Sequence, residues 1–95
     1  MKLHTTFETP DGKRTIQLKA RQGWTMFQLA NARSNGITAL ENPALRLAAY
    51  IHSLRKHGIS IETVMEEHGG TYEGQHARYR LAQEVTIQVL EGDVL

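Results

Sequence analysis

The sequence predicts an α+β fold, and three observations carry the prediction. Residues 42–58 have apolar side chains at helical spacing and a marker at each end. Apolar and polar residues alternate before this segment, within residues 3–20, and after it, from residue 59 onward. A repeat of three to four residues is typical of an amphipathic helix, whereas a repeat of two is typical of a half-buried strand. The chain therefore combines helices with strands.

Length and composition indicate one small globular domain. The chain has 95 residues, of which 40% are hydrophobic and 22% charged, so we expect residues 1–95 to share one modest core. Because the chain has no cysteine, a disulfide framework, a thiol nucleophile and a cysteine-based zinc site are excluded. We see no secretory signal and no run of the roughly 20 apolar residues that a membrane span needs. We therefore expect a cytoplasmic protein with no membrane partner.

Two strands are expected at the N-terminus. Alternation over residues 3–8 and 13–20 flanks Thr-Pro-Asp-Gly at residues 9–12, which is a strong turn signal. We predict a β-hairpin within residues 1–21 and assign it no function beyond scaffolding. A last strand, at residues 84–91, could pair with this hairpin.

The first of three predicted helices begins at Thr25. Thr25 and Gln28 have the spacing of a capping box, and the helix should run to Ala32 or Arg33 before Asn35-Gly36 stops it. We interpret Gln22-Gly23 as the break between the preceding strand and this helix.

A second, one-turn helix is predicted just before the long one. Thr38 and Glu41 form another capping-box pattern, but Pro43 disfavours helix at the residue before it. This second helix therefore leads almost directly into the third, and the three helices occupy residues 24–58.

The third helix, residues 42–58, has marked ends and two distinct faces. Asn42 can cap it, Pro43 suits the first helical position and Gly58 can end it. The apolar stripe comprises Ala44, Leu47, Ile51 and Leu54, with Ala48 beside them. The opposite stripe comprises Arg46, Tyr50, Ser53 and His57.

A hairpin at residues 59–82 follows the helices. We predict a strand at 59–66, a polar and Gly-rich loop at 66–76 and a return strand at 77–81 with Arg78 and Arg80 on its outer face. Three helices followed by a β-hairpin are the order of a winged helix-turn-helix. The expected fold is therefore α+β, with three helices, a C-terminal β-wing and an extra N-terminal β-hairpin.

Several short motifs also resemble a known family. They are SLRKHG at 53–58, IET at 61–63, HGG at 68–70 and GQHARYRL at 74–81. In this order and spacing, residues 43–81 resemble small bacterial and phage-type winged helix-turn-helix domains, most of them uncharacterised. The resemblance implies a DNA-binding type of domain, and it leaves out the N-terminal hairpin and the last strand.

The charge distribution and the third helix point to double-stranded DNA as partner. Residues 1–58 hold nine Lys and Arg against three Asp and Glu. In a helix-turn-helix the reading helix lies in the major groove, so we expect helix 43–57 there, in a small transcriptional regulator or phage-derived accessory factor. Arg46 could read a guanine, whereas Asn42 could contact a base or only cap the helix. The candidate DNA-binding residues are Asn42, Arg46, Ala49, Tyr50, Ser53, Lys56, His57, Tyr72, Gln75, Arg78 and Arg80.

An acidic wing leaves a second reading open. Glu66, Glu67 and Glu73 would repel phosphates, so the wing or the exposed helix face could instead dock a protein, and the chain would be a protein–protein interaction module. A homodimer is also possible, although no heptad pattern supports one.

The remaining ionisable residues suggest structural roles. Arg55 falls within the apolar arc, and we expect it to pair with Glu41, Glu62 or another carboxylate rather than with DNA. His68 and His76 could meet across the wing, where a hydrogen bond is favoured over zinc. We find no catalytic constellation and expect no enzyme, metal or cofactor.

Overall fold

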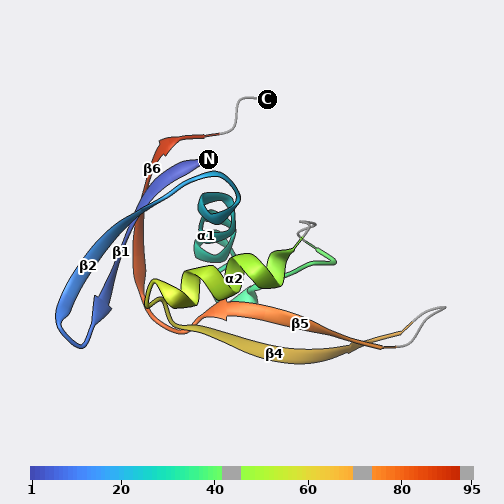
Figure 1. Cartoon of the computed structure of the whole chain (residues 1–95). Coiled ribbons are helices and arrows are strands. Elements are labelled where there is room, and N and C mark those ends of the chain that lie inside the picture. Colours follow the sequence, from blue (N-terminus) through green and yellow to red (C-terminus); the bar gives the residue numbers. More distant parts are fainter. Residues whose placement is uncertain (42–45, 70–73, 93–95) are drawn as a thin grey trace.

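The described part of the chain forms two three-stranded sheets and two α-helices. The computed structural model describes residues 1–41, 46–69 and 74–92, and Figure 1 shows both helices in the angle between the sheets. The elements are β1 (Lys2–Thr9), β2 (Gly12–Leu18), α1 (Ala20–Ala32), the 3₁₀ turn η1 (Arg33–Asn35), β3 (Ile37–Thr38), α2 (Leu47–Lys56), β4 (Ile61–His68), β5 (Gly74–Leu81) and β6 (Val85–Glu91).

The N-terminal sheet has the strand order β2-β1-β6, and both of its pairings are antiparallel. Thr5 of β1 lies opposite Ile16 of β2 and Ile87 of β6. In the turn between β1 and β2, the Thr9 hydroxyl donates to the Gly12 carbonyl at 2.8 Å. The predicted hairpin and its pairing with the last strand are therefore confirmed.

The second sheet, here called the wing sheet, has the order β3-β5-β4. Tyr79 of β5 pairs with Thr63 of β4 on one side and with Ile37 of β3 on the other. The hairpin β4–β5 is the predicted wing, and Figure 1 shows it running along α2 and extending past it. Its strands reach His68 and resume at Gly74, so the connection is shorter than the predicted loop at 66–76.

One apolar cluster joins the helices to both sheets. It takes side chains from β1, β2, α1, β3, α2 and β4, and from Ile59 between α2 and β4. The buried members are Leu3, Phe7, Leu18, Met26, Leu29, Ile37, Leu47, Ile51, Leu54, Ile59 and Ile61. Burial of these side chains packs the helices against both sheets.

The first helix begins five residues earlier than predicted. It starts at Ala20 and continues through Gly23, whose N–H donates to the Lys19 carbonyl at 3.2 Å. The Thr25 hydroxyl does not cap the helix but donates back to the Arg21 carbonyl at 2.7 Å. A single glycine costs a helix only about 1 kcal/mol, which the burial of Met26 and Leu29 outweighs.

The predicted second helix is absent from the described residues. Thr38 instead lies in β3, opposite Arg78 of β5, and residues 39–41 form a turn. Half of the expected capping box does form, because the Glu41 N–H donates to the Thr38 hydroxyl at 3.0 Å. The Glu41 carboxylate binds Arg78, and with Thr38 held in a sheet the turn cannot continue as a helix. Among residues 1–41, 46–69 and 74–92 the structure therefore has two α-helices where three helices were predicted.

The long helix is also shorter than predicted at its start. Arg46 has φ +66°, so α2 begins at Leu47, and the predicted cap Asn42 lies outside the described residues. The predicted end is confirmed. Gly58 has φ +99° and donates its N–H to Arg55, while the Ile59 N–H donates to Leu54. These two bonds form a Schellman motif, which needs a residue able to adopt positive φ.

Candidate functional site

The exposed face of α2 is rotated relative to the predicted one. The apolar stripe of Leu47, Ile51 and Leu54 is buried, as predicted. Four other residues are exposed: Ala48, His52, Arg55 and Lys56. Ala48 was expected beside the buried stripe and is instead open to solvent. Ala49, Tyr50, Ser53 and His57 are only half-exposed, so the predicted stripe lies at the margin of the accessible face.

His52 was missed as a candidate. It lies four residues from both Ala48 and Lys56, so the three share one side of the helix. His52 would have been identified if the candidates had been chosen from the side of the helix opposite the buried Leu47–Ile51–Leu54 stripe. The prediction instead followed the polar stripe through Tyr50.

Arg46 is exposed and stands at the N-terminal end of α2. It is the N-cap residue and not a member of the helix, and its carbonyl accepts the N–H groups of Ala49 and Tyr50 at 2.9 and 3.2 Å. Of the other predicted site residues, Gln75 is exposed on β5 and Tyr72 lies outside the described residues. The α2 candidates and the wing candidates therefore come from separate elements.

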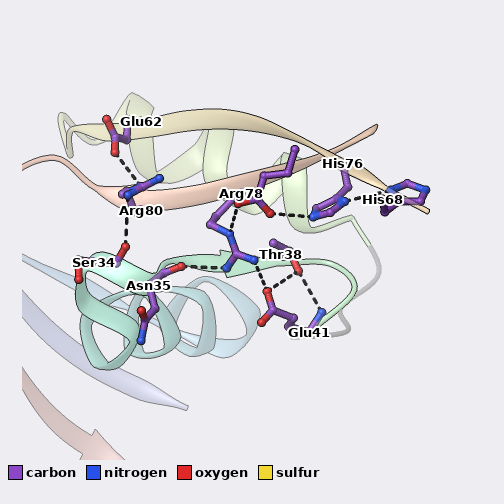
Figure 2. Close-up of polar contacts among 10 residues, drawn as sticks. Ser34, Asn35, Thr38, Glu41, Glu62, His68, His76, Arg78 and Arg80 are labelled. Atoms are coloured by element: carbon purple, nitrogen blue, oxygen red, sulfur yellow. Dashed lines mark hydrogen bonds and ion pairs between the residues drawn. The ribbon is translucent and has the colours of Figure 1, made fainter. Parts of the chain in front are cut away.

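Arg78 connects the wing to the segment between the helices (Figure 2). Its Nε donates to Glu66 on β4 at 2.7 Å, its Nη2 to Glu41 at 2.5 Å and its Nη1 to the Asn35 carbonyl at 2.8 Å. The side chain is 20% exposed. Its donors are thus directed at protein groups on two other segments.

Arg80, two residues further along β5, makes a similar connection. Its Nε forms an ion pair with Glu62 at 2.8 Å, and its Nη1 donates to the Ser34 carbonyl at 3.4 Å (Figure 2). We call Arg78, Arg80, Glu41, Glu62 and Glu66 the arginine network. Sequence reasoning assigned its two arginines to an outer basic face and could not see these contacts, which join residues far apart in the chain.

The acidic wing is partly neutralised by this network. The Arg78 hydrogen bond lowers the pKa of the Glu66 carboxyl, and a hydrogen bond from His76 lowers it further against the opposing effect of burial. In turn, the Glu66 hydrogen bond raises the pKa of Arg78. Glu67 remains exposed, and Glu73 lies outside the described residues. The wing therefore carries less uncompensated negative charge than its sequence suggests.

Arg55 has a structural role, as predicted, but with other partners. Its Nη2 donates to the Ile61 carbonyl and to the Thr63 hydroxyl, each at 2.7 Å. The expected partners, Glu41 and Glu62, bind Arg78 and Arg80 instead. Because Arg55 projects toward β4 from the last turn of α2, backbone and hydroxyl oxygens of β4 are nearer than those carboxylates.

The two wing histidines meet as predicted. The Nδ1 atoms of His68 and His76 are 3.0 Å apart, and the His76 Nε2 is 3.0 Å from a Glu66 oxygen (Figure 2). The histidine pair thus continues the arginine network toward the wing tip.

The N-terminal hairpin adds positive charge next to α2. Arg14 of β2 donates from Nη1 to the His57 carbonyl at 3.3 Å, and Lys13 beside it is exposed. This contact brings one cation, Arg14, to the C-terminal end of α2, where His57 is next to Lys56 in the sequence. The hairpin had been assigned no function, because nothing in the sequence relates residue 14 to residue 57.

Within residues 1–41, 46–69 and 74–92, no cluster of three or more His, Cys, Asp or Glu side chains is arranged to hold a metal ion. Over the same residues, none of the helices has the length and apolar character needed to cross a membrane.

Comparison with known families identifies a match. A family described as a winged helix domain matches residues 15–91. The match extends beyond the predicted resemblance of residues 43–81 and takes in β2, α1 and β6. No curated protein and no solved structure matches the chain.

Proposed function

This chain belongs to the winged helix domain family, and from that premise we propose that it binds double-stranded DNA with α2 in the major groove. Winged helix domains are generally nucleic-acid-binding modules, not enzymes. The single observation that carries the proposal is the exposed face of α2, which presents His52 and Lys56 with Arg46 at its N-terminal end. An α-helix fits the major groove, where its N-terminal residues reach base edges.

The residues of α2 divide by the contact that each can make. Arg46 can bind guanine O6 and N7, a contact that contributes about 1–3 kcal/mol of discrimination. His52 and Ser53 can donate to base edges or phosphates, and Lys56 suits a phosphate. Ala49 would lie against the groove wall, where its small side chain permits close approach. Tyr50 and His57, which are half-exposed, would contact the rim.

The wing and the hairpin would add phosphate contacts. Gln75 is exposed on the wing, and Tyr72, which lies outside the described residues, stays a predicted contact. Lys13 and Arg14 would extend the basic surface from the other end of α2. The arginine network supports a changed role for Arg78 and Arg80, which would position the wing and not contact phosphates directly.

The biological role that we propose is a small transcriptional regulator or phage-derived accessory factor acting in the cytoplasm. This role rests on the resemblance of residues 43–81 to bacterial and phage-type domains. A homodimer on a twofold DNA site is compatible with it.

Fluorescence anisotropy with a labelled mixed-sequence duplex tests the proposal. At about 50 mM salt, where phosphate contacts are strongest, we expect saturable binding that weakens steeply as salt increases. Lys56→Ala should reduce the slope of log K against log salt by about 1, as expected for one lost phosphate contact. Arg46→Ala should weaken binding to a selected site more than binding to random duplex.

Lys19→Ala is the matched control, because Lys19 is an exposed cation at the start of α1. It should leave the slope unchanged. No binding at about 50 mM salt would refute the proposal. If Lys19→Ala reduced the salt slope as much as Lys56→Ala does, the DNA contact would lie elsewhere than on α2.

A protein-docking role is the second candidate, and exposed apolar side chains favour it. Leu40 is 61% exposed and Met65 on the wing is 57% exposed. A double variant, Leu40→Ser with Met65→Ser, should abolish capture of a stoichiometric protein partner if this role is correct. The same variant should bind DNA normally if the first proposal is correct.

A further inference from the structure

We propose that His68 and His76 form a two-histidine chelate for a divalent transition-metal ion at the wing, with Glu66 as the outer carboxylate that orients His76. The inference is independent of DNA binding. It starts from the register of the wing, in which Glu66 lies opposite His76 and His68 opposite Gly74. Because side chains two residues apart share a face of a strand, Glu66, His68 and His76 project from the same side of the hairpin.

The hydrogen bonds determine which nitrogen of each histidine is available. The Glu66 carboxylate accepts from His76 Nε2, so the Nδ1 of neutral His76 carries a lone pair. That lone pair accepts from Nδ1–H of His68 across 3.0 Å. Glu66 is itself held by Arg78 at 2.7 Å. A metal ion would take the place of the proton shared between the two Nδ1 atoms, and His68 would bind it as the tautomer that carries its proton on Nε2, so that both rings stay neutral.

The spacing suits two adjacent positions around a metal ion. With metal–nitrogen bonds of about 2.0–2.1 Å, nitrogens at right angles lie about 2.9 Å apart and tetrahedral ones about 3.3–3.4 Å apart. The observed 3.0 Å is nearer the first value. The rings are inclined by 31°, with centroids 5.2 Å apart. To direct both lone pairs at one ion, each ring would have to turn by about 45° from the N–N line.

The donor set indicates the class of ion. Imidazole nitrogens bind Ni²⁺, Cu²⁺ and Zn²⁺, whereas Mg²⁺ and Ca²⁺ prefer oxygen ligands. Right-angled coordination favours Ni²⁺ and Cu²⁺ over Zn²⁺. An open depression beside His68, lined by Glu67, His68, Gly69, Gly74 and Gln75, leaves room for water as the remaining ligands.

The carboxylate behind His76 is the second observation that supports the site. Metal-binding histidines commonly donate their other ring N–H to a carboxylate, which fixes the tautomer and increases the ligand's basicity. Glu66 already lies 3.0 Å from His76 Nε2, and the hydrogen bond from Arg78 Nε at 2.7 Å holds its carboxylate in place. The ring of His76 is therefore oriented before any ion arrives.

Calorimetric titration of the full chain with NiCl₂ near neutral pH tests the proposal. We expect one saturable site in the wild type and none in His68→Ala or His76→Ala. His52→Ala and His4→Ala are the controls, because these histidines lie on α2 and β1, and both variants should bind like the wild type. A wild type without saturable binding, or a His68→Ala variant that binds normally, would overturn the proposal.

Glu66→Gln tests the positioning residue separately. Loss of an outer-sphere partner typically weakens metal affinity by about 10–100-fold, and we expect a loss in that range with an unchanged circular dichroism spectrum. An affinity equal to that of the wild type would remove Glu66 from the site. In a further readout, saturating Ni²⁺ should raise the midpoint of thermal unfolding in the wild type and not in His76→Ala.

Discussion

The two sheets are held to the rest of the molecule by different forces. In the N-terminal sheet, β1 presents Leu3, Thr5 and Phe7, all buried, to the core. In the wing sheet, every residue of β5 from His76 to Leu81 is half-buried, and charged groups make many of the contacts. The first sheet is thus stabilised mainly by apolar burial, and the second depends more on ion pairs and hydrogen bonds.

This difference shows why one end of the molecule should tolerate changes of salt and pH better than the other. Apolar burial is almost independent of both, whereas a partly exposed ion pair is screened by salt and depends on ionisation. The wing should therefore open locally under conditions in which the N-terminal sheet stays folded. Three changes test this difference between the N-terminal sheet and the wing sheet.

Phe7→Ala should have the largest effect. Phe7 is 2% exposed, and truncation of a buried phenylalanine costs about 3–5 kcal/mol through lost burial and the cavity that remains. That is a large part of the roughly 5–15 kcal/mol by which domains are stable. Urea unfolding should show the same loss at low and high salt. A loss that shrinks strongly with added salt would contradict the apolar account of this sheet.

Gly36→Ala should come next and should act on the wing sheet. Gly36 has φ +65° and ψ −173°, a region essentially restricted to glycine in which another residue costs about 1–3 kcal/mol. An added Cβ would lie 2.5 Å from the Tyr79 carbonyl oxygen. Because that oxygen belongs to the backbone of β5, the strand would have to move. Thermal unfolding should show a clearly lower midpoint, and Gly92→Ala, where nothing lies within 4 Å of the added Cβ, should show little change.

Acidification should have the smallest effect and the most local one. The pKa of Glu66 is lowered in the folded chain, chiefly by Arg78, so its contribution to stability is complete above the unfolded pKa of about 4.3. The contribution is lost as the pH falls through the lower, folded value. Hydrogen exchange between about pH 5 and pH 3 should show β4 and β5 losing protection before β1.

Glu66→Gln is the matching variant for acidification, and Glu84→Gln is its control at an exposed carboxyl. Glu66→Gln should remove part of the pH dependence of the wing, whereas Glu84→Gln should retain it. Equal loss of protection in both sheets would show that the acid response is global and not a property of the wing.

The local sequence pattern predicted the structure correctly where a single local signal determined the fold of a segment. Strand alternation and a Thr-Pro-Asp-Gly turn predicted the N-terminal hairpin, and Gly58 predicted the end of α2. Each of these features is determined by residues that lie close together in the sequence. The same holds for the His68–His76 hydrogen bond, which needed only the wing to close in the expected register.

Prediction failed where a distant strand competed with a local signal. Thr38 and Glu41 looked like a helix start, but pairing of Thr38 with β5 and capture of Glu41 by Arg78 took both residues away from a helix. The Arg14–His57 contact joins residues 43 positions apart and has no local signature. The accessible face of α2 likewise depends on what packs against its other sides, and so His52 was overlooked.

The three hydrogen bonds of Arg78 have a mechanical consequence. They fasten β5 to β4, to the end of η1 and to the turn at Glu41, which leads toward α2. The wing and that turn are therefore constrained to move as one body instead of as two hinged parts. A partner that contacts both the wing and the turn does not have to fix one relative to the other when it binds. That orientational entropy has already been lost during folding, so association requires less ordering.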